Sequence, residues 1–138
     1  MLRGFRRTGG LGAPALATVF VTWQTEGMQS FYSIYEIRQQ IPSRRPYIEF
    51  LRVPAMSCGV YVLRAGEEDP QLPHNEDEIY YVVSGVARMK VLPANESEQD
   101  RVITSGDVIF VKAHEEHRFH SITQELVLLV VFAPAVTM

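Results

Sequence analysis

Two histidines and one glutamate stand at spacings that suit a metal site. His74 and Glu78 lie four residues apart, and in an extended segment side chains two or four positions apart share one face. His117 follows about forty residues later, between two strand-like segments that strand pairing could bring beside the first pair. Two imidazoles and a carboxylate suit a divalent transition-metal ion. The sequence therefore predicts a divalent metal at these three residues, with Fe(II) or Mn(II) preferred over Zn(II) or Ni(II).

Each of these side chains also has an ordinary role that competes with metal binding. His74 follows Pro73 and could be an exposed turn residue, and Glu78 ends an acidic turn and could be solvated. His117 could hydrogen-bond to backbone at the mouth of a barrel. Glu78, however, stands at the head of an apolar strand, where a carboxylate faces inward and needs a partner. We therefore favour the metal hypothesis for all three.

The elements that must position these residues are short strands. From residue 47 onward, β-branched and aromatic runs alternate with Gly, Pro, Asn and acidic turns, which is typical of an all-β sandwich or barrel. Residues 31–40 form either a short helix or an entering strand, and Pro42 ends it. Ser84 and Gly85 form a tight connection between two strands. The predicted strands are 47–53, 57–64, 79–84, 86–92, 101–104, 108–111, 118–122 and 126–132.

The residues around the first histidine resemble the first motif of the cupin family, G-x5-H-x-H-x3-E-x6-G. Leu72 stands where the first histidine of that motif belongs. The agreement in spacing gives the resemblance its weight, and it covers roughly residues 47–132. Four residues match the motif without a gap: Gly66, His74, Glu78 and Gly85.

A later stretch resembles the second cupin motif, G-x5-P-x-G-x2-H-x3-N. Gly106 and His117 match it, whereas Lys112, His114 and Ser121 replace its proline, glycine and asparagine. The resemblance implies a cupin barrel domain over residues 28–138, folded as a double-stranded β-helix, or jelly roll. It also implies a homodimer paired through edge strands, which would cover the open edges of the sheet.

The departure at Leu72 changes the ligand set that the resemblance implies. Leucine cannot bind a metal, so three histidines and a carboxylate become two histidines and a carboxylate. That is the composition of the facial triad of non-haem Fe(II) oxygenases, which leaves coordination positions open. The alternative is a weakened or lost metal site. Asp69, Gln71 and Glu76 are reserve ligands, available only if the preceding loop bends toward the site.

Other side chains near these motifs have weaker claims to a role. Tyr80 and Phe119 would share the inner face with Glu78 and are the pocket candidates, although such residues are more often core. Tyr80 could offer its hydroxyl to a substrate. His120 would lie on the opposite face as a structural residue, and His114 in the loop is either near the site or solvated. Three arginines could pair with a substrate carboxylate but more simply lie on solvated strand faces: Arg64, Arg88 and Arg118.

Length and composition restrict the class of protein. The chain has 138 residues, of which 46% are hydrophobic and 21% charged, with a net charge of −3, as in a single globular domain. Nucleic acid is not expected as a partner, because phosphate binding needs a concentrated Lys/Arg surface. The single cysteine, Cys58, cannot form an internal disulfide and lies in an apolar run. We expect it to be a core residue, in a reducing compartment or at least in a fold that needs no disulfide.

Residues 1–27 differ in composition from the rest of the chain. They contain three arginines, one acidic residue and an apolar patch interrupted by Gly12 and Pro14. A mitochondrial presequence would be serine-rich and a secretory signal would have a longer apolar region and a cleavage site. We therefore favour an extension ahead of a working start at Met28, and a cytoplasmic protein, with mitochondria as the alternative. No segment here is long enough to span a bilayer.

These observations favour metal-dependent chemistry on a small organic molecule inside the barrel, either by Lewis-acid catalysis or in the manner of a dioxygenase. The alternative is a non-catalytic module that binds a small ligand and has a weak or lost metal site, and the leucine at position 72 keeps it open. A purely structural partner protein is a third hypothesis and would have no ligand cavity.

Overall fold

The computed structural model describes residues 29–42 and 46–137, so the predicted extension over residues 1–27 lies outside the described part. One helix, α1 (Ile34–Arg38), precedes a six-stranded sheet. Within the described residues, no helix is long and apolar enough to cross a membrane. The strands are β1 (Tyr47–Val53), β2 (Met56–Leu63), β3 (Asp77–Leu92), β4 (Gln99–Thr104), β5 (Val108–Val111) and β6 (Glu116–Ala133).

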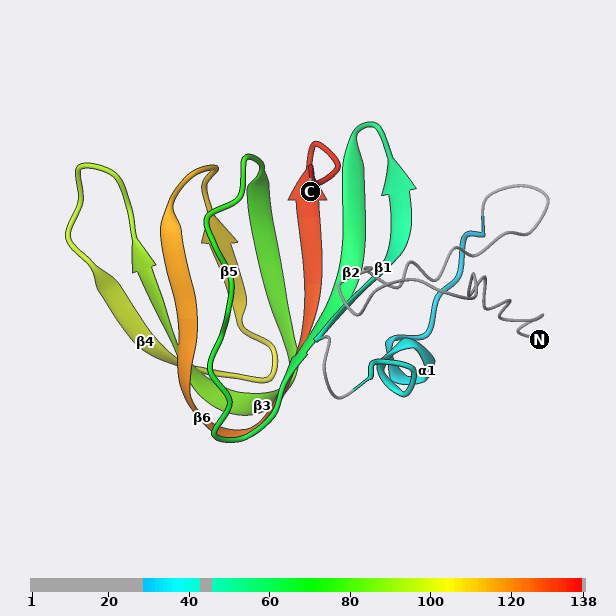
Figure 1. Cartoon of the computed structure of the whole chain (residues 1–138), viewed down its shortest axis with the longest axis horizontal. Helices are drawn as coiled ribbons and strands as arrows, with labels where there is room; N and C mark the ends of the chain where they lie inside the picture. Colours follow the sequence, from blue (N-terminus) through cyan, green and yellow to red (C-terminus); the bar gives the residue numbers. More distant parts are fainter. Residues whose placement is uncertain (1–28, 43–45, 138) are drawn as a thin grey trace, which may run out of the picture.

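Two long strands, β3 and β6, form the centre of the fold and bend back on themselves at the bottom of Figure 1. They pair antiparallel from Asp77↔Ala133 to Leu92↔Glu116. The first part of β3 also pairs with β5 and its second part with β4, while the second part of β6 pairs with β2. The two halves of the bent sheet therefore face each other, which confirms the predicted double-stranded β-helix.

The bend lies where the sequence predicted a turn. The predicted strands 79–84 and 86–92 are one continuous strand, so the prediction of a tight connection at Ser84 and Gly85 is wrong. The strands predicted at 118–122 and 126–132 are likewise one strand. The pairing of β3 with β6 shifts its register between Val82 and Arg88, and such shifts can turn a strand without ending its pairing.

The strand that carries Glu78 alternates as a half-buried strand should. Glu78, Tyr80 and Val82 are buried, whereas Ile79 and Tyr81 are exposed. Side chains two apart share a face of the sheet, so the glutamate lies on the inner face of the barrel, as predicted. This inner face also holds the larger of two apolar clusters, built from all parts of the sheet.

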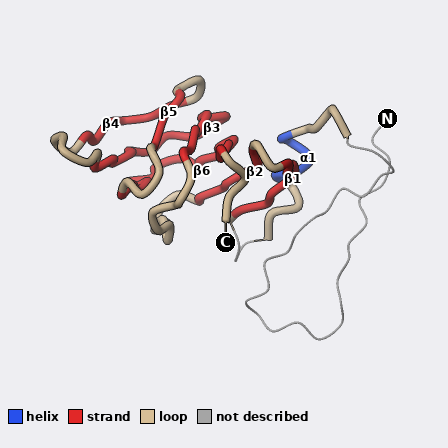
Figure 2. Tube along the Cα trace, turned by 90° about the horizontal axis from the view of Figure 1, so that it is seen from above, coloured by secondary structure: helices blue, strands red, loops and turns tan. Residues whose placement is uncertain are grey.

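The helix explains why β2 is buried on both faces. Val60 and Val62 point away from the barrel interior and pack with Ile37 of α1, which is 1% exposed. Figure 2 shows the helix beside β1 and β2, away from β4. Ser33 caps the helix by accepting a hydrogen bond from the Glu36 amide, which settles the choice between helix and strand. Cys58 is buried, as predicted.

Gly85 lies where β3 shifts its register against β6, and its backbone conformation and close neighbours favour glycine. Its φ is +102°, and a Cβ added there would lie 2.2 Å from the Glu125 carbonyl oxygen. We expect Gly85→Ala to destabilise the protein by more than about 3 kcal/mol, because backbone atoms of β6 would have to move. Gly66→Ala is the matched control: its φ is +80° with nothing within 4 Å, so only about 1 kcal/mol of conformational strain is expected. Urea unfolding measures both, and equal losses would contradict this account.

Candidate metal centre

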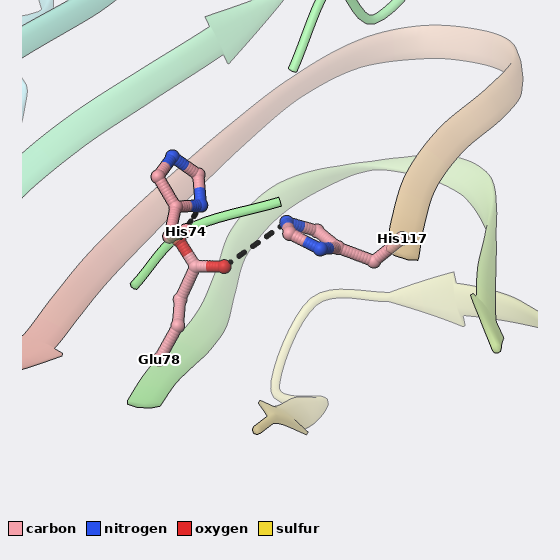
Figure 3. Close-up of side chains that lie close together, drawn as sticks. All are labelled: His74, Glu78 and His117. Carbon is pink, nitrogen blue, oxygen red and sulfur yellow. Dashed lines mark ion pairs between the residues drawn. The ribbon is translucent and has the colours of Figure 1, made fainter. Parts of the chain in front are cut away.

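Three side chains converge inside the barrel: His74 and Glu78, which are four residues apart, and His117 from a distant part of the chain (Figure 3). Nδ1 of His74 lies 3.6 Å from Oε2 of Glu78, and Nε2 of His117 lies 3.1 Å from Oε1 of Glu78. One nitrogen or oxygen from each residue falls within 4.8 Å of the others. We call these three residues the triad. The convergence predicted from the sequence is present.

The bend in β3 and β6 produces this convergence. Glu78 lies near the start of β3, opposite Phe132 of β6, whereas His117 pairs with Val91 near the other end of β3. Because the paired strands fold back between these two points, both side chains point into the same interior. His74 reaches it from the loop just before β3.

The loop that carries His74 is tied to the loop that precedes His117. The His114 amide donates to the His74 carbonyl at 2.7 Å, and the Ala113 amide donates to Asp77 Oδ1 at 2.9 Å. His114 has φ +69° and occupies the glycine position of the second motif. Histidine is among the residues that tolerate this left-handed conformation. The side chain of His114 is exposed, and His114 is not one of the three converging residues, so its contribution here is the backbone link.

A backbone contact orients the imidazole of His117. Its Nδ1 lies 2.9 Å from the Glu115 carbonyl oxygen, so Nδ1 carries the hydrogen and donates it. In the neutral ring, Nε2 then presents its lone pair toward Glu78. Metal-binding histidines usually have this kind of second contact, which fixes the tautomer and the ring orientation.

The triad holds its polar atoms in the interior with few partners. Both carboxylate oxygens of Glu78 and Nδ1 of His74 are buried, the Glu78 side chain is 1% exposed, and the carboxylate contacts the imidazoles of His117 at 3.1 Å and His74 at 3.6 Å. A buried carboxylate without compensation is costly. A divalent cation would satisfy all three atoms at once, so the residues present fit a metal ion.

Contacts within the triad shift the pKa values of Glu78 and His117 in opposite directions. Burial pushes the pKa of Glu78 upward most strongly, but contacts with His117 and His74 outweigh it, and the pKa lies below its ordinary value. For His117 the opposite holds. Burial lowers the pKa most strongly, yet contacts with Glu78 and the Glu115 carbonyl raise it above its ordinary value. Without a metal, the two groups therefore favour a carboxylate beside a protonated imidazole.

The reserve ligands have other partners. Asp69 is 6% exposed, accepts from the Tyr61 hydroxyl at 2.7 Å and from the Phe119 amide at 2.9 Å, and so fastens its loop to the barrel. Glu76 Oε1 accepts from the amide and the hydroxyl of Thr137 at 2.8 and 2.5 Å. Both carboxylates thus hold chain segments in place rather than joining the triad.

Gln71 and Leu72 lie in the loop before His74, and Leu72 occupies the position of the first histidine of the cupin motif. The Gln71 side chain donates to Asp69 Oδ2 at 3.0 Å and accepts from the Tyr80 hydroxyl at 2.8 Å. Leu72 is 77% exposed. Together with Pro73 they border two cavities, one that reaches His74 and one that reaches His117.

The two predicted pocket candidates are fully buried. Tyr80 and Phe119 are both 0% exposed and pack edge to face with centroids 4.9 Å apart. The Tyr80 hydroxyl lies 3.1 Å from Nε2 of His117 and therefore borders the triad. Phe119 makes its contacts within the apolar core.

The remaining charged candidates lie outside the triad. Arg88 and His120 both contact Asp100 at 3.0 Å, so His120 has the structural role predicted for it. Arg64 and Arg118 are exposed. The structure therefore places none of the three arginines where it would pair with a substrate carboxylate in the cavity beside His74.

Sequence reasoning missed two tyrosines that line the cavity beside His74. This cavity of about 470 Å³ is bordered by Tyr47, Tyr61, Phe132 and Val136, among others. Gly59 was a signal for one of them, since the Tyr47 ring occupies the space where a Cβ at Gly59 would lie. A glycine inside a strand often marks such a close approach.

Comparison with known proteins agrees with the fold and the motifs. The family described as Cupin domain matches residues 59–132, and this chain belongs to that family. A Streptomyces coelicolor protein, Uncharacterized protein SCO3923, is 46% identical over 88 residues, which cover 64% of this chain and 79% of that protein.

Two solved structures show the same fold. TT1209 from Thermus thermophilus aligns with a TM-score of 0.63 and 19% identity, over 78% of this chain and 99% of that one. The enzyme HppE, solved with Fe(II) and the alternative substrate (S)-1-HPP, aligns with a TM-score of 0.52 and 20% identity. That match covers 62% of this chain and 48% of HppE.

The triad predicts how the charge on Glu78 affects His117. In chelator-treated protein, we expect Glu78→Gln to lower the pKa of His117, because the contact with the Glu78 carboxylate raises it. An NMR titration of the His117 ring proton measures the change. Asp100→Asn is the control, since Asp100 contacts His120 and not His117. An unchanged or higher pKa of His117 in Glu78→Gln would contradict the described triad.

Proposed function

We propose that this cupin binds one divalent metal ion through His74, Glu78 and His117 and uses it for chemistry on a small organic molecule inside the barrel. One observation carries the proposal: one ligand atom each from His74, Glu78 and His117 lies within 4.8 Å of the others inside the barrel, where Glu78 and His117 are buried. Fe(II) or Mn(II) is preferred, since two histidines and one carboxylate form the donor set of non-haem Fe(II) sites. The Fe(II) named for the similarly folded HppE supports this preference.

A bound metal would supply Lewis-acid polarisation of a substrate oxygen or a site for dioxygen. The residues of the chain prepare that site. Glu78 provides the negative charge, and the Glu115 carbonyl holds the His117 ring so that Nε2 faces the triad. The Tyr80 hydroxyl oxygen lies 3.1 Å from Nε2 of His117, and the hydroxyl donates its proton to the side-chain oxygen of Gln71 at 2.8 Å. Burial raises the pKa of Tyr80, so this proton stays on the phenol.

A non-catalytic ligand-binding protein is the second candidate function. The observation that favours it is Leu72, which replaces a motif histidine and is largely exposed. Three ligands bind more weakly than four when the geometry is otherwise equal, and such a barrel could hold a ligand without turnover.

Metal analysis of protein purified without a His-tag tests the proposal. We expect about one metal ion per wild-type chain and less than about 0.1 per chain in His117→Ala, because removal of one of three ligands abolishes tight binding. His120→Ala is the matched control: it removes a histidine that contacts Asp100 on another part of the barrel, and it should keep the wild-type content.

The outcomes separate the candidate functions. Equal metal in wild type and His117→Ala would show that the metal lies elsewhere. Less than about 0.1 metal ion per wild-type chain would favour the ligand-binding protein. If the metal is present and needs His117, oxygen uptake against a panel of small organic molecules distinguishes dioxygen chemistry from Lewis-acid chemistry.

A further inference from the structure

The cavity beside His74 has a wall without acidic or basic side chains among the described residues: none that lines it is Asp, Glu, Lys or Arg. Its surface comes mainly from aromatic and aliphatic side chains, and its volume of about 470 Å³ lies in the range of sites for small organic molecules. An ionic substrate would lose its hydration here, and none of the described side chains in this wall is a charged Asp, Glu, Lys or Arg that could pair with it.

Almost every polar side chain in this wall already has a partner. The Tyr61 hydroxyl donates to Asp69 at 2.7 Å, and Thr137 donates to Glu76 at 2.5 Å. Gln71 uses both ends of its amide. The His74 imidazole faces Glu78 and belongs to the triad.

The exception is Tyr47. Its hydroxyl oxygen is buried and has no hydrogen-bond partner. The ring lies over the backbone of Gly59, where a Cβ would be 2.3 Å from that oxygen, and its centroid is 6.4 Å from that of Tyr61. An unsatisfied buried hydroxyl costs about 1–3 kcal/mol, so the Tyr47 hydroxyl lowers the stability of the ligand-free protein.

We propose that the substrate is an uncharged, mainly apolar molecule that fills this cavity, and that the Tyr47 ring, which lines the cavity, shifts on binding so that its hydroxyl donates a hydrogen bond to one oxygen of the molecule. A second oxygen of the molecule faces the triad, and this part rests on the proposed function. The phenol is suited to donate, since burial raises the pKa of Tyr47 and keeps the proton on its oxygen. The second cavity, beside His117, contrasts with this one because Lys90, Glu98 and Arg118 line it.

Three probes of similar shape test the substrate class: acetophenone is neutral with a carbonyl acceptor, ethylbenzene lacks the acceptor, and benzoate is anionic. Binding to the full chain is followed by protein NMR before and after chelator treatment. The chelator removes any bound metal, so benzoate cannot bind more tightly by coordinating a metal ion directly. We expect acetophenone to shift the resonances of Val130 and Phe132 in both forms, and to bind at least about tenfold more tightly than benzoate to the chelated protein.

Tyr47→Phe tests the anchor. We expect it to weaken acetophenone binding about three- to tenfold, as for loss of one hydrogen bond, and to leave ethylbenzene binding unchanged. It should also raise the melting temperature of the ligand-free protein by a few degrees, because the unsatisfied hydroxyl is gone. Tyr35→Phe is the matched control, since Tyr35 is 73% exposed, and it should alter neither quantity.

The two proposals fail in different ways. Benzoate binding as tightly as acetophenone to the chelated protein, or acetophenone binding equally to wild type and Tyr47→Phe, would overturn the inference about the cavity. Neither result would affect metal content. A wild-type chain that binds acetophenone through Tyr47 but holds no metal would overturn the proposed function and keep the neutral-ligand cavity.

Discussion

The buried carboxylate of Glu78 is the constraint on which the rest of the site depends. It is 1% exposed, and its oxygens contact the imidazoles of His117 at 3.1 Å and His74 at 3.6 Å. Such a group must either take up a proton or sit beside positive charge. Here the contacts with two imidazoles hold its pKa below the ordinary value. The glutamate therefore stays charged, and the interior has a place for a cation.

The fold can be understood as the structure that makes this arrangement possible. The bend in β3 and β6 brings Glu78 and His117 to the same interior from opposite ends of one strand pair. Short backbone contacts then fix the details: the His114 amide holds the loop of His74, and the Glu115 carbonyl holds the ring of His117. Asp69 fastens the remaining loop across the barrel. In each of these contacts, at least one of the two partners is a residue outside the triad.

The sequence predicted the features that depend on local spacing. The triad, the all-β class and the inward face of Glu78 and Tyr80 follow from period-two alternation and from motif spacing. The merging of strands at Gly85 could not be predicted, since a glycine with positive φ serves turns and bulges alike. Only pairing with a distant strand, β6, decides between them.

Features that depend on distant contacts were also missed. Asp69 looked like a reserve ligand because its partner, the Phe119 amide, is fifty residues away. Tyr47 looked like an ordinary strand residue because the cavity beside it forms only when β1, β6 and the loop before β3 meet. The predicted homodimer and the predicted cellular location stay predictions.

Anomalous X-ray scattering from crystals grown with Mn(II) tests the central claim most directly. The account predicts one peak per chain, within roughly 2.3 Å of one nitrogen of each histidine of the triad and of an oxygen of Glu78. A peak bound to other side chains, or no peak in crystals where the three side chains point apart, would contradict it.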